Sequence, residues 1–379
     1  MTQDQIIAFR LHQHHLVKPI DETQLELAAA AGLQNTVPGT VPLALGVRLL
    51  NFNLEILDRA MQKKKTLVEI TGIRGASYIV PSRDFSIFTT AAYPRSEKDL
   101  ASFIKGSFKS LKSAKSSATE VVETVAKVTL EILNKKALTQ DEIHEQWRRK
   151  LTKNFLRWCR GCQSFHVPYS VVMAVGIKGC FCFGPYKDGT TAYVRTDQWL
   201  PSRFIKNDME EARRQLAQRF LHFYGPNTVS GFANWAGLSK NQAQETWSLV
   251  EEDLLEIPDT TGTRWLLKKD VKAFGSPPTP PKVVLLPPRD AFLNLPDRET
   301  LVPEKKHHPH VWRVLGNPGV LLVNGRVAAL WKFQKKKDTL QSQFTALEKI
   351  PKALREIAEE KLETLVPLRE CKNSEVEWN

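Results

Sequence analysis

Three polar side chains follow the end of an alanine-rich helical run near the N-terminus. Gln34, Asn35 and Thr36 stand in the stretch AAAAGLQNTVPG, which covers residues 28–39. Amide and hydroxyl oxygens accept hydrogen bonds and can hold a water molecule in place. By local rules alone the stretch is a helix C-cap, since Gly32 would end the helix and Pro38 would prevent its resumption. The residue types therefore allow either an ordinary cap or the start of a site.

Four of the five cysteines occur as two close pairs, which raises the question of a zinc site. Cys159 and Cys162 form a C-x-x-C pair, and Cys180 and Cys182 form a C-x-C pair. Four thiolates at suitable spacing can hold zinc. The C-x-C spacing is tight for such a site, however, and GCFCFG is typical of a buried strand in which free cysteine acts as a small hydrophobic residue. We therefore predict no metal and no cofactor.

Other groups that could do chemistry have plainer structural interpretations. The histidines at 12–15 and 307–310 lie in polar stretches and are expected to be exposed. Asp290 and Asp297 flank a loop-like stretch, and Asp297 with Arg298 could form a local ion pair. No P-loop, dinucleotide fingerprint or G-x-S-x-G motif is present, which disfavours nucleotide-dependent and serine-hydrolase chemistry.

The overall charge favours a polyanionic partner. The chain has 379 residues with 54 Lys and Arg against 41 Asp and Glu, a net charge of +13. Lys and Arg placed near phosphate release condensed counterions, so a polyanion such as a nucleic acid is a favoured partner, which charge alone does not identify. The N-terminus lacks an apolar signal region and no window could span a bilayer. We therefore expect a soluble, cytoplasmic protein, acting as a monomer and without a membrane partner.

The order of helical and strand-like stretches predicts winged helices followed by a strand-rich domain, and these elements must position the residues above. Helical stretches precede two strand-like runs around Gly72 and Gly75, which is the order of a winged helix. We place this first winged helix at 1–92 and a second unit at 93–200. In the second unit, Thr139 followed by Glu142 is a capping-box signature that should begin a helix.

The third unit, 201–275, has the clearest pattern. A short helix reaches Trp235, a Gly-Leu-Ser turn follows, and a second helix starts near Asn241 before two strands. A second helix of this kind commonly enters the DNA major groove. Beyond the proline-rich joint, residues 276–379 predict a β-barrel-like domain with an Asn324-Gly325 hairpin turn and a terminal helix. The predicted fold class is α+β.

Several stretches together resemble the AlkZ-like winged-helix DNA glycosylases. GLQNTVPGTVPLALGVRL, RGASYIVPSRD and CFGPYKDGTTAYVRTDQWLP are similar to successive landmarks of that family. FYGPNTVSGFANWAGLS, LLPPRDAFLNLPDR and VWRVLGNPGVLLVNGRVAALWK continue the series in order. The resemblance covers nearly the whole chain. It implies three tandem winged helices and a β-barrel that together bind DNA, and hydrolytic removal of alkylated bases, in some members crosslinked ones.

The resemblance also implies a catalytic motif at this corner, and the residues of this chain differ from that motif at two positions. The family signature is Gln, an apolar residue, then Gln or Asp. Its first Gln corresponds to Gln34, and the two following positions are Asn35 and Thr36 here. A second landmark that ordinarily ends in His ends here in Tyr78, four residues after Arg74.

These departures leave three functions open: a glycosylase in which Gln34 positions water, assisted by Asn35 and Thr36; a DNA-binding protein without catalysis; and a protein-interaction role. In the first two, the predicted DNA-binding residues are Arg74, Tyr78, Lys63, Lys64, Lys240, Asn241, Gln242 and Arg298.

Overall fold

The protein divides into two compact units, each assembled from separate stretches of the chain. The computed structural model describes residues 1–105, 116–187, 190–204, 208–259, 262–313 and 315–379. Unit 1 contains residues 1–58, 217–235 and 250–379, and unit 2 contains residues 59–216 and 236–249. The domain boundaries expected from the sequence stay predictions. In the described part of the chain, no helix is both long and apolar enough to cross a membrane.

The N-terminal part of unit 1 consists of short helices and two-residue strands. A parallel pairing joins β1 to β3. The elements are α1 (Gln3–Gln13), β1 (Ile20–Asp21), α2 (Leu25–Ala28), β2 (Leu33–Gln34), α3 (Thr40–Gly46), β3 (Leu49–Leu50) and α4 (Leu54–Asp58). One face of α1 packs against α15 (Val271–Gly275), where Phe9 meets Phe274 edge to face at 5.5 Å between ring centroids. This contact ties the start of the chain to residues far along it.

The C-terminal part of unit 1 is an open sheet, so the prediction of a β-barrel was wrong. The strands are β12 (Val283–Leu286), β13 (Gly319–Val323), β14 (Arg326–Lys336), β15 (Thr339–Ala346) and β16 (Asn373–Trp378), which lie in that order. No pairing among the described residues joins β12 to β16, so the sheet does not close.

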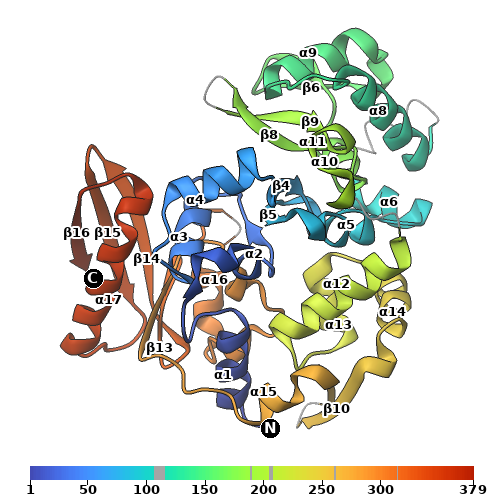
Figure 1. Ribbon diagram of the computed structural model, residues 1–379. Helices are drawn as coiled ribbons and strands as arrows, with labels where there is room; N and C mark the ends of the chain where they lie inside the picture. The colour runs from blue at the N-terminus through green and yellow to red at the C-terminus, as the bar shows by residue number, and fades with distance from the viewer. Residues whose placement is uncertain (106–115, 188–189, 205–207, 260–261, 314) are drawn as a thin grey trace. The chain divides into compact units, whose positions relative to one another are not determined.

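The position of the terminal helix explains why the C-terminal sheet stays open. Helix α17 (Lys352–Leu365) connects β15 to β16 and lies against the sheet (Figure 1), so β16 runs parallel to β15 as an edge strand. A sheet covered on one face shows the same alternation of apolar and polar residues as a barrel, and the sequence pattern alone could not separate them.

The core of this sheet forms between its covered face and α17. Trp331 on β14 is fully buried, and its indole Nε1 donates to the carbonyl oxygen of Leu286 at 2.7 Å. The predicted turn is confirmed: Asn324 and Gly325 both have positive φ, at 48° and 83°, between β13 and β14. The predicted terminal helix is confirmed as well.

Unit 2 contains a second sheet, in which β5, β4, β8 and β9 follow one another with antiparallel neighbours. The predicted hairpin at Gly72 and Gly75 is β4 (Leu67–Thr71) with β5 (Ser77–Pro81). The pair β8 (Phe181–Lys187) and β9 (Thr190–Arg195) completes the sheet. A smaller hairpin joins β6 (Arg157–Cys159) to β7 (Ser164–His166).

Helices cover this sheet and enclose an apolar core. They are α5 (Phe85–Phe88), α6 (Glu97–Phe103), α8 (Ala118–Ile132), α9 (Gln140–Lys150), α10 (Tyr169–Ile177) and α11 (Thr196–Trp199). The predicted capping box begins α9: Thr139 accepts from the backbone of Glu142, whose carboxylate accepts from the backbone of Thr139. Behind it, the indole Nε1 of Trp147 donates to Thr129 Oγ1 at 3.0 Å inside the core.

The chain order predicted for residues 229–267 is confirmed, and one further helix, not predicted from the sequence, precedes it. Helices α12 (Met209–Tyr224), α13 (Val229–Ala236) and α14 (Lys240–Ser248) precede the antiparallel strands β10 (Leu254–Asp259) and β11 (Gly262–Leu267). Ser239 caps α14, since its hydroxyl accepts from the backbone N–H of Gln242. A single-turn helix, α16 (His308–Val311), is the remaining helix drawn in Figure 1. The sequence therefore located helix, turn, helix and hairpin correctly.

Candidate active site and DNA interface

The corner that contains Gln34 is built by two glycines. Helix α2 ends at Ala28, four residues before the Gly32 predicted from the sequence; residues 29–31 form turns, and Gly32, with φ 78°, leads directly into β2. Gly39 has φ 77° and leads into α3, where the Thr40 hydroxyl donates to the carbonyl oxygen of Val37 at 2.8 Å. Positive φ is a conformation that glycine adopts without steric cost. Residues 35–39 thus form a short loop between β2, which ends at Gln34, and α3.

The three polar side chains of this corner differ in their surroundings. Gln34 is buried, at 8% exposure, and among the described residues its Oε1 has no hydrogen-bond partner. Asn35 is partly buried and engaged with the protein, whereas Thr36 is exposed. A buried acceptor without a partner is costly, so such groups ordinarily meet a water or a ligand. Gln34 is therefore the residue at this corner with an unmet hydrogen-bonding capacity.

An arginine that sequence reasoning missed lies behind the loop. Arg369 Nη1 donates to the carbonyl oxygen of Pro38 at 3.3 Å, and its guanidinium lies 5.2 Å from the ring centroid of Phe333. A Cβ added at Gly39 would lie 1.2 Å from Arg369 Nη1, so only glycine leaves room for this approach. Burial lowers the pKa of Arg369. No local signal could reveal this contact, because more than 300 residues separate the partners.

Three ion pairs, made by Asp290 and Asp297, join distant segments of unit 1. Arg48, 1% exposed, binds Asp290, 0% exposed, with both guanidinium nitrogens at 2.7 and 2.8 Å. Asp297 is held by Arg10 and by Arg264 rather than by the neighbouring residue proposed from the sequence. Burial alone would raise the pKa of Asp297, but the charges and hydrogen bonds of the two arginines outweigh it and lower that pKa. Both aspartates therefore have structural partners.

The second landmark, from Arg74 to Tyr78, lies in unit 2. Arg74 is exposed, has φ 57°, and its Nη2 donates to the hydroxyl of Tyr78 at 3.4 Å. Tyr78 is buried at 1% exposure. A Cβ added at Gly237 would lie 2.6 Å from Arg74 Cγ, so the arginine packs on the turn that precedes α14. The structure thus brings Arg74 next to the start of the predicted recognition helix.

The remaining predicted DNA-binding residues separate into exposed and buried ones. Lys240 and Asn241 are exposed on the first turn of α14. Gln242, by contrast, is 3% exposed and its Nε2 donates to the carbonyl oxygen of Tyr93 at 2.9 Å. Its amide is therefore occupied by the protein, because the next position along the helix turns inward. Tyr78 is also buried, at 1% exposure, and its hydroxyl accepts a hydrogen bond from Arg74.

Three further cationic residues of the prediction are exposed. Lys63 and Lys64 stand at the end of a π-helical turn, Arg59–Lys63, in unit 2. Arg298, in unit 1, lies over the indole of Trp312, with 4.9 Å between the guanidinium carbon and the ring centroid. The exposed positive charges of these three residues suit contact with phosphate.

The histidine and cysteine clusters differ from their sequence interpretations. His14 was expected to be exposed but is 1% exposed among Phe223, Tyr224 and Phe292. Burial, with the charge of Arg48, lowers the pKa of His14 well below its ordinary value. The side chain is therefore neutral near pH 7.

The two cysteine pairs occupy different environments. Cys180 and Cys182 are buried in unit 2, as predicted, and burial raises their pKa to about 11 and about 12. Cys159 and Cys162 instead lie at the β6–β7 turn beside His166. Hydrogen bonds to Cys159 from the backbone of Cys162 and from the side chains of His166 and Cys162 lower the pKa of this thiol to about 6. The sequence signal for His166 is its position four residues after the second cysteine, in the pattern C-x-x-C-x-x-x-H.

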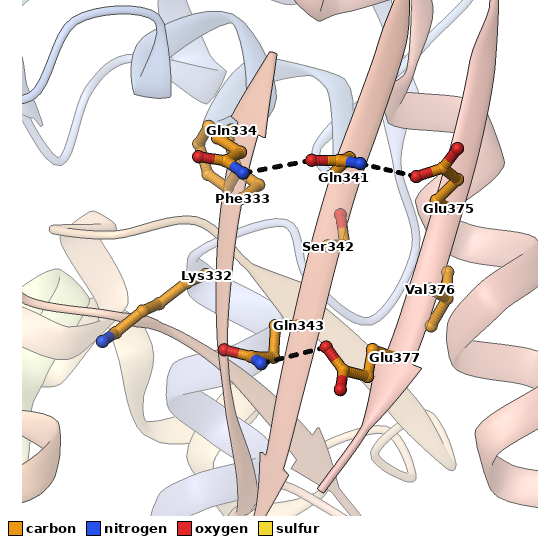
Figure 2. Close-up of a pocket in the computed structure, with 9 residues that line it drawn as sticks. All are labelled: Lys332, Phe333, Gln334, Gln341, Ser342, Gln343, Glu375, Val376 and Glu377. Atoms are coloured by element: carbon orange, nitrogen blue, oxygen red, sulfur yellow. Dashed lines mark hydrogen bonds between the residues drawn. The ribbon is translucent and has the colours of Figure 1, made fainter. Parts of the chain in front are cut away.

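A polar pocket of about 580 Å³ lies on strands β14, β15 and β16 (Figure 2). Gln341 bridges Gln334 and Glu375 through hydrogen bonds of 3.1 and 2.6 Å. Gln343 donates to Glu377 at 3.0 Å. Two carboxylates in one pocket disfavour phosphate, so this face is unsuited to the DNA backbone.

Comparisons with known proteins agree with this geometry. The family described as DNA glycosylase AlkZ-like matches residues 27–367. The solved structure of the Streptomyces sahachiroi DNA glycosylase AlkZ superposes with a TM-score of 0.79 at 17% identity, covering 99% of each chain. The search of curated protein sequences finds no match. The family match spans most of the chain, including the Gln34 corner and helices α13 and α14, and the chain therefore belongs to the AlkZ-like DNA glycosylase family.

Proposed function

We propose that this protein hydrolyses the N-glycosidic bond of alkylated bases in double-stranded DNA, with an N7-alkylpurine as the substrate class. Gln34 is the residue that we assign to the reaction, and the buried, unpartnered Oε1 of Gln34 is the observation that supports this most strongly. Membership in a family of DNA glycosylases and a net charge of +13 support the choice of DNA as substrate. The protein would act as a monomer in the cytoplasm.

The chemistry demands little acid catalysis. Alkylation at N7 gives the purine a positive charge, so the base leaves as a neutral molecule when its bond to C1′ breaks. The sugar then carries oxocarbenium-like charge, and water adds to C1′ and loses a proton to solvent. In the proposed reaction, Gln34 Oε1 accepts a hydrogen bond from that water and directs its oxygen at C1′. A neutral amide is sufficient because the leaving group is already activated.

The two neighbouring side chains have smaller proposed parts. Thr36 occupies the position that is Gln or Asp in the family signature, and its exposed hydroxyl is shorter than either. Asn35 is already engaged with the protein. We therefore assign assistance in positioning water to Thr36 and support of the loop to Asn35. Arg369 is a positioning residue, since it acts on the backbone of the loop rather than on DNA.

The proposed DNA-binding surface of unit 2 is the start of α14 with Arg74 beside it. Lys240, Asn241 and Arg74 are exposed at this place, and the turn at Gly237 permits the approach of Arg74. Lys63 and Lys64, and Arg298 in unit 1, are further proposed phosphate contacts. If Lys240 contacts phosphate, Lys240→Ala should weaken binding to all duplex sequences and reduce the slope of log affinity against log salt by about 1.

Base release under single-turnover conditions tests the proposal. The substrate is a duplex with one N7-methylguanine, and the matched control is Gln24→Ala, an exposed glutamine ten residues earlier in the chain. Loss of one preorganised polar group in an active site costs about 10²–10³ in rate, so Gln34→Ala should slow release by that factor. Gln24→Ala should release base like the wild type. Equal rates for Gln34→Ala and wild type would refute the assignment.

One observation favours a second function, a DNA-binding protein without catalysis. Thr36 stands where the family carries Gln or Asp, and it is exposed rather than directed into the buried corner. This alternative predicts salt-dependent duplex binding with no base release by the wild type. Thr36→Asp and Thr36→Gln distinguish the two: under the alternative, either change should create base release in a protein that otherwise shows none.

A further inference from the structure

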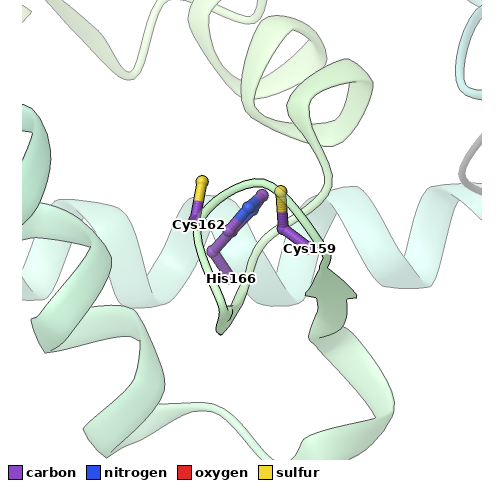
Figure 3. A group of neighbouring side chains, drawn as sticks. All are labelled: Cys159, Cys162 and His166. Atoms are coloured by element: carbon purple, nitrogen blue, oxygen red, sulfur yellow. The ribbon is translucent and has the colours of Figure 1, made fainter.

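The β6–β7 hairpin of unit 2 gathers three side chains with metal-binding atoms. Cys159 ends β6, Cys162 lies in the turn, and His166 ends β7. The two sulfurs and the imidazole nitrogen all lie within 4.8 Å of one another. Figure 3 shows the three side chains at the same turn, with the imidazole between the two sulfurs. None of them belongs to the proposed glycosylase site.

The backbone of the hairpin produces this arrangement. Cys159 pairs with Ser164 and Arg157 with His166 across the two strands. Gln163 has φ 49°, the left-handed conformation that lets the chain reverse just after Cys162. The turn therefore returns His166 to the neighbourhood of both cysteines. The spacing C-x-x-C-x-x-x-H thus becomes a compact set of two sulfurs and one nitrogen.

The imidazole is held in an orientation suited to binding a cation. His166 Nδ1 lies 3.1 Å from the carbonyl oxygen of Val167. A carbonyl oxygen only accepts hydrogen bonds, so this contact favours the tautomer with its proton on Nδ1, in which Nε2 carries the lone pair that a cation needs. Metal-binding histidines characteristically donate their other ring N–H to a carbonyl or carboxylate in this way.

The hairpin also lacks an apolar core of its own. Each strand has three residues, and the aromatic pair between them, Trp158 with Phe165, is 45% and 41% exposed. Two-stranded hairpins of this size are marginally stable in water. A cross-link between the turn and the end of β7 would therefore stabilise a segment that packing holds only weakly.

We propose that Cys159, Cys162 and His166 bind one zinc ion through the two sulfurs and Nε2, with water as the fourth ligand. Two thiolates and a neutral imidazole balance the charge of Zn²⁺, and binding releases any proton that the two sulfurs still carry. Tetrahedral bonds of about 2.3 Å place ligand atoms about 3.8 Å apart, which small side-chain rotations can reach from the observed limit of 4.8 Å. A disulfide would use both sulfurs but gives no reason for the fixed imidazole. The zinc site would order the hairpin and take no part in base removal.

Zinc binding by the whole reduced chain, freed of metal, tests the proposal. We expect one zinc per chain in a competition titration, and a thiolate-to-cobalt absorption band when Co²⁺ is used instead. Cys162→Ser and His166→Ala should each weaken zinc binding at least about tenfold. Cys371→Ser and Cys180→Ser, which remove buried thiols elsewhere, should leave affinity unchanged.

A second measurement uses the wild-type protein alone, so it does not depend on whether a variant folds. In the wild type, zinc should slow hydrogen exchange in peptides covering residues 157–166 and leave exchange elsewhere unchanged. Absence of stoichiometric zinc binding would overturn the proposal, as would unaltered binding in both Cys162→Ser and His166→Ala. A Cys159–Cys162 disulfide that persists in the presence of thiol reductant and blocks zinc would overturn it too.

Discussion

The ion pair between Arg48 and Asp290 should be the most sensitive electrostatic contact in unit 1. Its side chains are 1% and 0% exposed. Arg48 Nη1 also donates to the carbonyl oxygen of Ala44 at 2.8 Å, and Asp290 Oδ1 accepts from the backbone N–H of Phe292 at 2.9 Å. The pair therefore joins the end of α3, the helix after the Gln34 loop, to the segment that follows β12. Removing it should loosen both.

The change that exposes this dependence is Arg48→Met. It deletes two charge-assisted hydrogen bonds and leaves the Asp290 carboxylate buried without a counter-ion. Breaking such a pair from one side costs about 3–5 kcal/mol of unfolding free energy. The double variant Arg48→Met with Asp290→Leu removes both charges, and apolar replacements of buried pairs are often neutral. It should therefore be more stable than Arg48→Met alone.

Urea unfolding followed by circular dichroism measures the effect, and hydrogen exchange of peptides from 40–50 and 283–295 assigns it to unit 1. The control is Arg149→Met, which breaks an ion pair with Glu145 whose partners are 66% and 48% exposed. That surface pair should contribute under about 1 kcal/mol. The reasoning is refuted if Arg48→Met costs no more than the control, or if the double variant is less stable than Arg48→Met.

Three more predictions concern pH and the loop behind Gln34. Burial lowers the pKa of His15 to about 4 and that of His14 well below 6.5, so below pH 6.5 the unfolded chain binds protons that the folded chain does not. The free energy of unfolding should therefore fall as the pH is lowered from about 6.5 towards 4. A urea midpoint that rises as the pH is lowered would contradict this. Gly39→Ala should destabilise the protein by about 1 kcal/mol or more, because φ is 77° and the new methyl group meets Arg369; a urea midpoint equal to the wild type would count against it. Arg369→Met should slow base release while leaving duplex affinity within about twofold, and a large loss of affinity with unchanged release would show that Arg369 binds DNA instead.

Local sequence rules predicted the elements whose causes lie within a few residues. Asn324 and Gly325 make a hairpin turn, and Thr139 caps α9, each through contacts with near neighbours. Gly32 was predicted to end a helix that instead stops at Ala28. The helix, turn, helix and hairpin order of 229–267 followed from the same kind of signal.

What the sequence could not predict depends on contacts between distant residues. Arg48 and Asp290 are 242 positions apart, and Asp297 binds Arg10 from 287 positions away, so neither partner is visible in a local pattern. The open sheet was predicted as a barrel because closure depends on where β16 pairs, and alternation does not encode this. The burial of Gln34, the main support for its proposed part, likewise required the folded chain.

The most direct test of the central claim is the single-turnover rate of N7-methylguanine release by the wild type and by Gln34→Ala, measured at enzyme concentrations that saturate the duplex. Saturation separates chemistry from binding, so a change in rate reports on the reaction itself. The proposed function predicts measurable release by the wild type and a rate about 10²–10³ lower for Gln34→Ala, with duplex affinity retained. Wild-type protein that binds the duplex and releases no base would contradict it, as would release by Gln34→Ala at the wild-type rate.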